Sequence, residues 1–329
     1  MEAMRVSDSF ISVRHTALLL TLGLSVILLA GGCSIKRMAL NKVGNALSQS
    51  TGGTFASDND PELIGDALPF SLKLMESILA ETPQHVPLLV ALSRGFTSYS
   101  FAYLQMEADY IEEADLQAAR AMRERARNLY LRARNYGLQG LEASRPGFTN
   151  LFFSSPELAL ATLKPSKEEN RNLVQWTLSP WAAAISLSKD RPDMIAELPH
   201  VESMIEWMLR WEGYAQEPVL DSLLMSFESV RTQLPPGAGT LEERIRRDFE
   251  GALRQGNGLL AGPYVTLAEA VSIQNQDVEE FKSLLGSALA IDVDLYPEAR
   301  LENLLMQKRA RWLLEQVDEL FLPELPPEE

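Results

Sequence analysis

A long amphipathic α-helix is predicted by the segment Asp60-Pro-Glu-Leu-Ile-Gly-Asp-Ala-Leu-Pro-Phe-Ser-Leu-Lys-Leu-Met-Glu-Ser-Ile-Leu-Ala-Glu-Thr-Pro83. Asp60 is suited to accept an N–H of the first turn as an N-cap, and Pro61 suits the first helical position because its φ is already helical. Apolar residues then recur at helical spacing, from Ile64 to Leu79. Pro83 cannot continue a helix, so the segment predicts both ends of the element.

Helical signals of this kind dominate the rest of the chain, and no sustained alternation of apolar and polar residues predicts a strand. We therefore predict an all-α protein. A second helix is expected from about Pro87, and a third over 115–143, which ends either near Gly137 or at Ala143. Two or three helices are expected between Glu157 and Leu187, with breaks at Lys164-Pro165 and Ser179-Pro180. The remaining helices are expected over 193–211 and 217–234, and from Thr240, Asp277 and Pro297.

One spacing suggests that the helices are arranged as pairs. Ala288 lies five residues before Val293, a turn position that is usually proline in tetratricopeptide (TPR) repeats, and Phe281 and Leu285 precede it at the large packing positions. Ile78–Pro83 repeats the spacing. A small residue lets paired helices approach closely, so we predict an array of antiparallel helix pairs with cryptic TPR-like repeats. Val293 in place of proline predicts a looser turn.

The N-terminus has the order of a secretory signal: Arg5 and Arg14, then a short apolar run, then Ala30-Gly31-Gly32-Cys33. The run is shorter than the roughly 20 residues that a membrane-spanning helix needs. Cys33 is the only cysteine in the chain, and its setting resembles a bacterial lipobox, whose cysteine is lipidated. We predict a signal peptide over 1–32, a lipid-anchored helix and linker over 33–58, a helical domain over 59–321 and a flexible tail over 322–329.

Composition restricts the chemistry of the mature chain. With Cys33 used as an anchor, no thiol is left, and His85 and His200 are the only histidines beyond the signal. These two are expected to cap or lie on helices rather than bind a metal, since a catalytic zinc site draws on several such ligands. A net charge of −15 argues against nucleic acid partners.

Two side-chain stripes are candidate binding residues. Phe96, Tyr99 and Tyr103, with Trp176 and Trp181, are candidates to line an amphipathic cleft, although their spacing also fits a hydrophobic core. A basic stripe could dock an acidic partner, although it also fits a solvated face balanced by local acids; it comprises Arg120, Arg123, Arg127 and Arg134.

Other motifs do not have the spacing that their chemistry needs. Asp58-Asn59-Asp60 fits helix capping rather than a calcium loop, and Gly256–Gly262 follows a helix, which predicts an interhelical turn rather than a dinucleotide site. No nucleophile–base arrangement is present. We therefore expect no catalytic residue, no cofactor and no metal.

Five segments together resemble one family. They are Ala56–Lys73, Leu129–Leu138, Trp181–Lys189, Ala261–Ala270 and Gln307–Leu314. In this order they are similar to the T-component lipoproteins of TRAP transporters, the TatT family. The resemblance implies an all-helical periplasmic lipoprotein with TPR-like helix pairs, a homotrimer with a central pore, and a partner in the solute-binding (P) protein of the transporter. It also implies delivery of a small, hydrophobic ligand through a cleft or pore.

Two other functions are open at this stage. One is a lipoprotein scaffold for envelope assembly, and the other is a hydrolase of envelope polymers that uses paired carboxylates. For the location, Ser34 after Cys33 lacks the Asp that often signals inner-membrane retention. We therefore expect the protein at a membrane facing the periplasm, with the outer membrane favoured.

Overall fold

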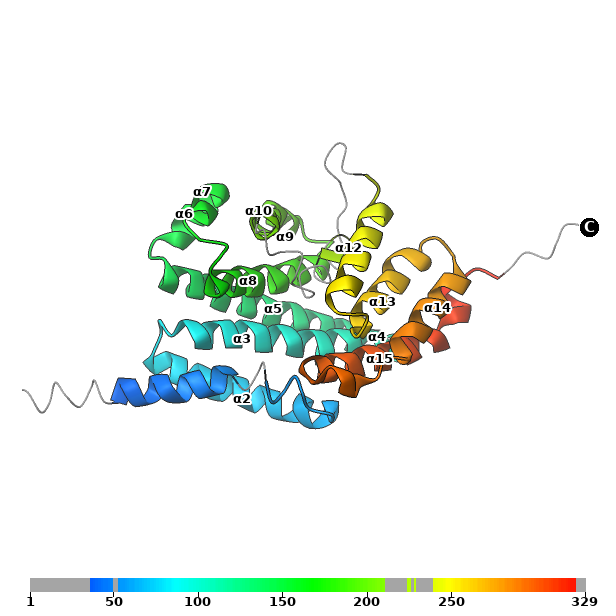
Figure 1. The fold of residues 1–329 in the computed structure, drawn as a ribbon, viewed down its shortest axis with the longest axis horizontal. Helices are drawn as coiled ribbons and strands as arrows, with labels where there is room; N and C mark the ends of the chain where they lie inside the picture. The colour runs from blue at the N-terminus through cyan, green and yellow to red at the C-terminus, as the bar shows by residue number, and fades with distance from the viewer. Residues whose placement is uncertain (1–35, 50–52, 211–223, 226–227, 229–238, 324–329) are drawn as a thin grey trace, which may run out of the picture.

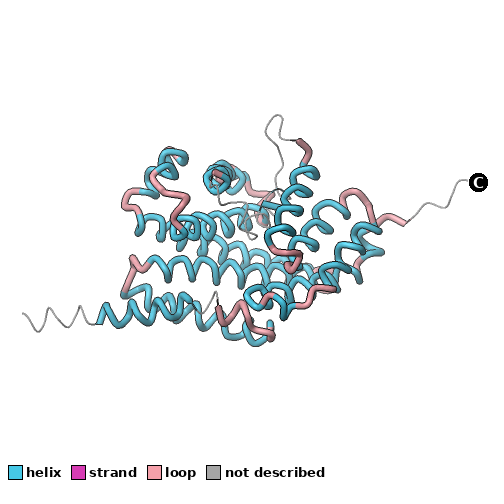
Figure 2. The backbone as a smooth tube through the Cα atoms, viewed as in Figure 1, coloured by secondary structure: helices cyan, strands magenta, loops and turns pink. Residues whose placement is uncertain are grey.

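The structure, a computed structural model, describes residues 36–49, 53–210, 224, 225, 228 and 239–323. All regular elements in these ranges are helices and none is a strand (Figure 2), which confirms the all-α prediction. No helix in the described ranges is long and apolar enough to span a membrane. The predicted signal peptide, Cys33 and most of the predicted helix over 217–234 lie outside the described residues.

Four long helices form the N-terminal layers of the molecule (Figure 1). They are α2 (Pro61–Glu81), α3 (Val86–Ser100), α5 (Leu116–Ser144) and α8 (Glu168–Ser186). α3 packs on α2, and α5 packs on both α3 and α8. Gly137 allows the close approach of α5 to α8, because a Cβ atom there would lie 2.9 Å from the Cα atom of Thr177.

Shorter helices cover these layers. The helix over 36–49 lies beside the α2–α3 corner, where Lys36 binds Glu81 at 2.8 Å. The opposite side carries α6 (Phe148–Ser154), α7 (Pro156–Ala161), α9 (Pro192–Ile195) and α10 (Leu198–Leu209) (Figure 1).

The C-terminal helices build a second core around Phe281, Leu285 and Leu313. The helices are α12 (Leu241–Gln255), α13 (Ala261–Leu267), α14 (Val278–Leu289), α15 (Arg300–Glu315) and α16 (Val317–Leu320), with 3₁₀ turns at Val293–Leu295 and Pro297–Ala299 between α14 and α15.

Two π-helical segments connect these parts. α3 continues through η1 (Phe101–Gln105) into α4 (Met106–Ile111), and α13 continues through η3 (Ala268–Ser272). Ala102 and Met106 of the first continuation join the C-terminal core, so this chain of helices links the two ends of the molecule.

Three predicted helix starts are confirmed by their caps, while the last helix, predicted from Pro297, begins at Arg300 after a 3₁₀ turn over Pro297–Ala299. Asp60 accepts the Leu63 N–H at 3.0 Å and Asp277 accepts the Glu280 N–H at 2.8 Å. Thr240 and Glu243 form a reciprocal capping box. Each cap joins residues three apart in sequence, so local sequence is sufficient to predict it.

The predicted break at Ser179-Pro180 is wrong, because α8 runs through Pro180. A proline lacks the N–H that would bind the carbonyl four residues earlier, here the Trp176 carbonyl. The Ser93 hydroxyl of α3 donates to that carbonyl instead. A side chain from another helix therefore supplies the missing donor.

The predicted single helix over 193–211 is two helices, α9 and α10, with Ala196 and Glu197 between them. Pro199 explains the interruption, since it has no N–H for the Ile195 carbonyl. α6 was not predicted, and Gly137 lies within α5 rather than at its end.

The packing of α14 on α15 agrees with the predicted small-residue spacing. Ala288 is fully buried there, with Phe281 and Leu285. The 3₁₀ turn that begins at Val293 follows. Close packing of this helix pair is therefore observed, while a TPR repeat along the chain stays a prediction.

Candidate functional site

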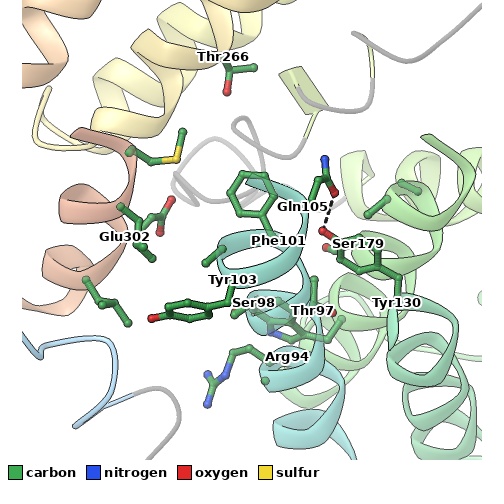
Figure 3. Close-up of a pocket in the computed structure, with 18 of the residues that line it drawn as sticks. Arg94, Thr97, Ser98, Phe101, Tyr103, Gln105, Tyr130, Ser179, Thr266 and Glu302 are labelled. Carbon is green, nitrogen blue, oxygen red and sulfur yellow. Dashed lines mark hydrogen bonds between the residues drawn. The ribbon is translucent and has the colours of Figure 1, made fainter. Parts of the chain in front are cut away.

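A central cavity of about 860 Å³ lies where the N-terminal layers meet the C-terminal helices. Its walls come from α3 with η1, from α8, from α13 with η3, and from α15 (Figure 3). Ile64 and Leu68 of α2, Tyr130 of α5, and Phe55 and Ala56 also line it. The volume lies within the range of pockets that bind small organic molecules.

Both π-helical segments form part of the cavity wall. Phe101, Tyr103 and Gln105 come from η1, and Glu269 and Ala270 come from η3. A π-helix holds an extra residue per turn, which redirects side chains relative to an α-helix, and such segments are frequent at functional sites. The redirected side chains at this junction therefore make it the best candidate site.

The wall is mainly apolar, with polar groups held in fixed positions. Tyr130 donates its hydroxyl proton to the Gln105 side-chain oxygen at 2.9 Å, the bond drawn in Figure 3. Tyr103 donates to the Pro61 carbonyl at 2.7 Å. Burial, with Asp58 and Asp60 nearby, raises the pKa of Tyr103 to about 12, so its hydroxyl is protonated at neutral pH.

Arg94 contributes a cation to the wall. Its guanidinium donates to the Ser48 carbonyl at 3.3 Å and lies 6.0 Å from the ring centroid of Trp176. Burial lowers the pKa of Arg94. The arginine therefore ties the N-terminal helix over 36–49 to α8 across one side of the cavity.

The five predicted aromatic residues separate into two groups. Tyr103 and Trp176 line the central cavity. Phe96 stacks on Tyr136 with 5.9 Å between centroids, and Tyr99 packs partly buried between the α2–α3 and α5–α8 cores. Trp181 is fully buried and donates to Glu197 at 2.7 Å. Phe96, Tyr99 and Trp181 therefore pack in or against the hydrophobic core, which was the alternative to a cleft lining.

The basic stripe on α5 is largely paired within the chain. Arg123 bridges Asp109 and Glu112, with N–O distances of 2.7 Å and 2.8 Å. Arg127 binds Glu124 at 3.1 Å, and Arg134 binds Glu197 at 2.8 Å. Arg120 is the exposed member. The docking role of the stripe stays a prediction.

The two histidines occupy structural positions. His85 N-caps α3, where its Nδ1 accepts the Leu88 N–H at 3.1 Å, so Nε2 carries the proton and faces the Asn41 carbonyl at 3.2 Å. His200 stacks on Trp181 with 5.5 Å between ring centroids. Among the described residues, no group of three or more His, Cys, Asp or Glu is arranged to hold a metal ion.

Sequence patterns did not identify several cavity residues, above all Glu302 of α15. Its carboxyl lines the cavity beside Leu305 and Met306. One signal was available: an acid on a helix whose apolar positions otherwise face the core. That signal is weak, because 45 acidic residues are spread over this chain.

Comparison with known proteins gives the family. A family model described as TRAP transporter T-component matches residues 57–321. An uncharacterized protein of Treponema pallidum (strain Nichols) is 30% identical over 314 residues, which cover 90% of this chain and 95% of that protein. The family is a component of a transporter and not a family of enzymes, so it supports an accessory role in transport over the predicted alternatives. Because the family model matches far more than half of the sequence, residues 57–321, the chain belongs to the TRAP transporter T-component family.

Proposed function

We propose that this protein docks the solute-binding (P) protein of a TRAP transporter and passes a small ligand with an apolar body through the central cavity. The observation that carries the proposal is the cavity of about 860 Å³, which is mainly apolar and is walled by helices from both the N-terminal and the C-terminal parts of the chain. Family membership supports the association with a transporter. The homotrimer that the resemblance implies is part of the proposal.

A cavity-filling substitution tests the transfer role. Ala183 lines the cavity on α8, and Ala183→Trp places an indole in that space. We expect reduced ligand uptake by cells that depend on the transporter, with co-purification of the P protein unchanged. Ala80→Trp, at an exposed position of α2, is the matched control and should change neither measurement. Normal uptake with Ala183→Trp would refute transfer through the cavity.

Co-purification of the full chain with the organism's solute-binding proteins tests docking. We expect one P protein to associate. If none does, the docking part fails and the scaffold function becomes the better proposal. Arg120→Glu is the first docking variant to make, because Arg120 is the exposed member of the stripe and charge reversal at a rim chiefly slows association.

We further propose that a lipid on Cys33 holds the protein at the periplasmic face of the outer membrane. The support is the lipobox-like setting of Cys33 and the Ser34 that follows it. Cys33→Ser should release or mislocalise the protein without changing its unfolding temperature. Fractionation of cells measures this, and a variant that stays in the same membrane fraction would refute the lipid anchor.

A further inference from the structure

Glu302 presents a carboxyl to the central cavity from α15 (Figure 3). Among the described residues, no side chain or backbone N–H forms a hydrogen bond or ion pair with it. Its neighbour on the wall differs: Glu269 binds Arg309 at 2.7 Å. The fold therefore pairs the Glu269 carboxylate with a cation, while no cation among the described residues pairs with Glu302.

The basic residues nearest to Glu302 in α15 are engaged elsewhere. Arg300 binds Asp294 at 2.9 Å, and Lys308 binds Glu107 at 2.6 Å. Arg309 binds Asp109 at 2.9 Å in addition to Glu269. None of the three is thus available to Glu302 without breaking an existing pair.

The surroundings of Glu302 disfavour an isolated charge. Burial raises the pKa of its carboxyl, with no opposing influence from a cation. By its accessible surface, however, the Glu302 side chain is exposed. A side chain that lines a cavity reconciles the two facts, because solvent reaches it through a space that protein atoms surround. A cationic group bound in that space would favour the ionised carboxylate.

The opposite wall suits the same kind of group. Phe101 and Tyr103 of η1 lie across the cavity from Glu302 (Figure 3). Aromatic ring faces attract ammonium groups, and the attraction is stronger where water is excluded. Leu301, Leu305 and Met306 flank the acid on its own helix, so an apolar body can pack beside the charged group.

We propose that the ligand of the central cavity is an organic cation, with an apolar body and an ammonium group that binds the Glu302 carboxylate. This inference rests on the proposed role of the cavity in ligand transfer, and it adds the chemical class of the ligand. Two other cations line the wall, Arg94, which donates to the Ser48 carbonyl, and the exposed Lys189, and neither forms an ion pair with Glu302 in the described residues.

Three probes of equal chain length test the class of ligand: octylammonium, octanol and octanoate. Equilibrium dialysis against the full chain in lipid nanodiscs measures binding of each, and nanodiscs without protein give the lipid partition to be subtracted. We expect octylammonium to bind about tenfold tighter than octanol, the effect of one charge-assisted hydrogen bond. Octanoate should bind most weakly.

The variant Glu302→Gln should remove the preference for octylammonium and leave octanol binding unchanged. Its unfolding temperature should equal that of the wild type, since Glu302 has no partner to lose among the described residues. Glu298→Gln is the matched control, because Glu298 lines the same cavity at an exposed position. It should keep the preference.

The outcomes separate this inference from the proposed function. Equal binding of the three probes, tightest binding of octanoate, or a preference that survives Glu302→Gln would overturn the cation proposal while the cavity stays a ligand site. If none of the probes binds, the transfer role of the cavity fails as well.

Discussion

The close approach of α5 to α8 at Gly137 gives the sharpest test of the fold. A Cβ atom at this position would lie 2.9 Å from both the Cα and Cβ atoms of Thr177. Real Cβ atoms essentially never come within 3.0 Å of a neighbour, and a backbone atom cannot move by rotamer change. Gly137→Ala therefore forces the two central helices apart.

The expected change in stability for Gly137→Ala follows from two opposing effects. Replacing a helix-interior glycine by alanine stabilises a helix by about 1 kcal/mol, and overpacking a core costs about 1–3 kcal/mol. Because backbone takes part in the clash, we expect the upper end of that cost and a net loss of about 2 kcal/mol. Gly286→Ala is the matched control, since a Cβ atom there meets nothing within 4 Å. It should stabilise the protein by about 1 kcal/mol.

Urea and thermal unfolding followed by circular dichroism measure both variants. The same chemical change should move stability in opposite directions, with a difference of about 3 kcal/mol. Adding Thr177→Ala to Gly137→Ala should recover little, because the clash with the backbone of residue 177 is still present. If Gly137→Ala stabilises the protein as much as Gly286→Ala does, the helices do not approach as described.

Two further variants test buried polar contacts. Burial alone would raise the pKa of the Glu76 carboxyl, but hydrogen bonds from Lys73 at 2.6 Å and Tyr136 at 2.5 Å outweigh it and lower that pKa below its ordinary value. The stabilisation by ionised Glu76 is therefore present above the ordinary pKa of a glutamate and is lost as pH falls through the lowered pKa. Glu76→Gln should lower the free energy of unfolding by about 1–2 kcal/mol at pH 7. If urea titrations show that this difference between the variant and the wild type does not shrink at acid pH, the role of ionised Glu76 is contradicted. Ser93→Ala removes the donor to the Trp176 carbonyl and should lower stability in thermal unfolding by about 1–3 kcal/mol. The control is Ser98→Ala, at an exposed position of the same helix, which should lower stability by less than about 0.5 kcal/mol. Equal losses of stability in the two variants would refute the role of Ser93 at Pro180.

The local sequence was sufficient to predict a feature of the fold wherever that feature depends on a contact between residues close in sequence. The caps of Asp60, Thr240 and Asp277 each join residues three apart, and all three were predicted. Pro180 shows the limit of this reasoning. The local rule predicts a break there, but the donor that allows the helix to continue comes from Ser93, 83 residues before the accepting carbonyl.

The candidate site also depends on contacts between residues far apart in sequence, which local patterns do not predict. Helical spacing places aromatic residues on one face of a helix, but it does not say which partner covers that face. Trp176 and Trp181 both lie on α8, yet Trp176 lines the cavity while Trp181 is fully buried against Glu197 and His200. The difference arises from which tertiary neighbours pack on each side of α8. The family resemblance rested on segments spread over the mature chain, and the family match confirms it.

The cavity depends on η1, because residues of this segment both pack into the C-terminal core and line the cavity wall. Ala102 packs into the C-terminal core with Ala268 and also lines the cavity, together with Phe101, Tyr103 and Gln105. The extra residue of a π turn changes the directions of the side chains relative to an α-helix, so an α-helical register would place these residues differently. η3 has the same position on the facing wall. The segments that join the two cores are thus the segments that shape the ligand space, so a substitution that restores α-helical register in either one would alter the cavity and the packing together.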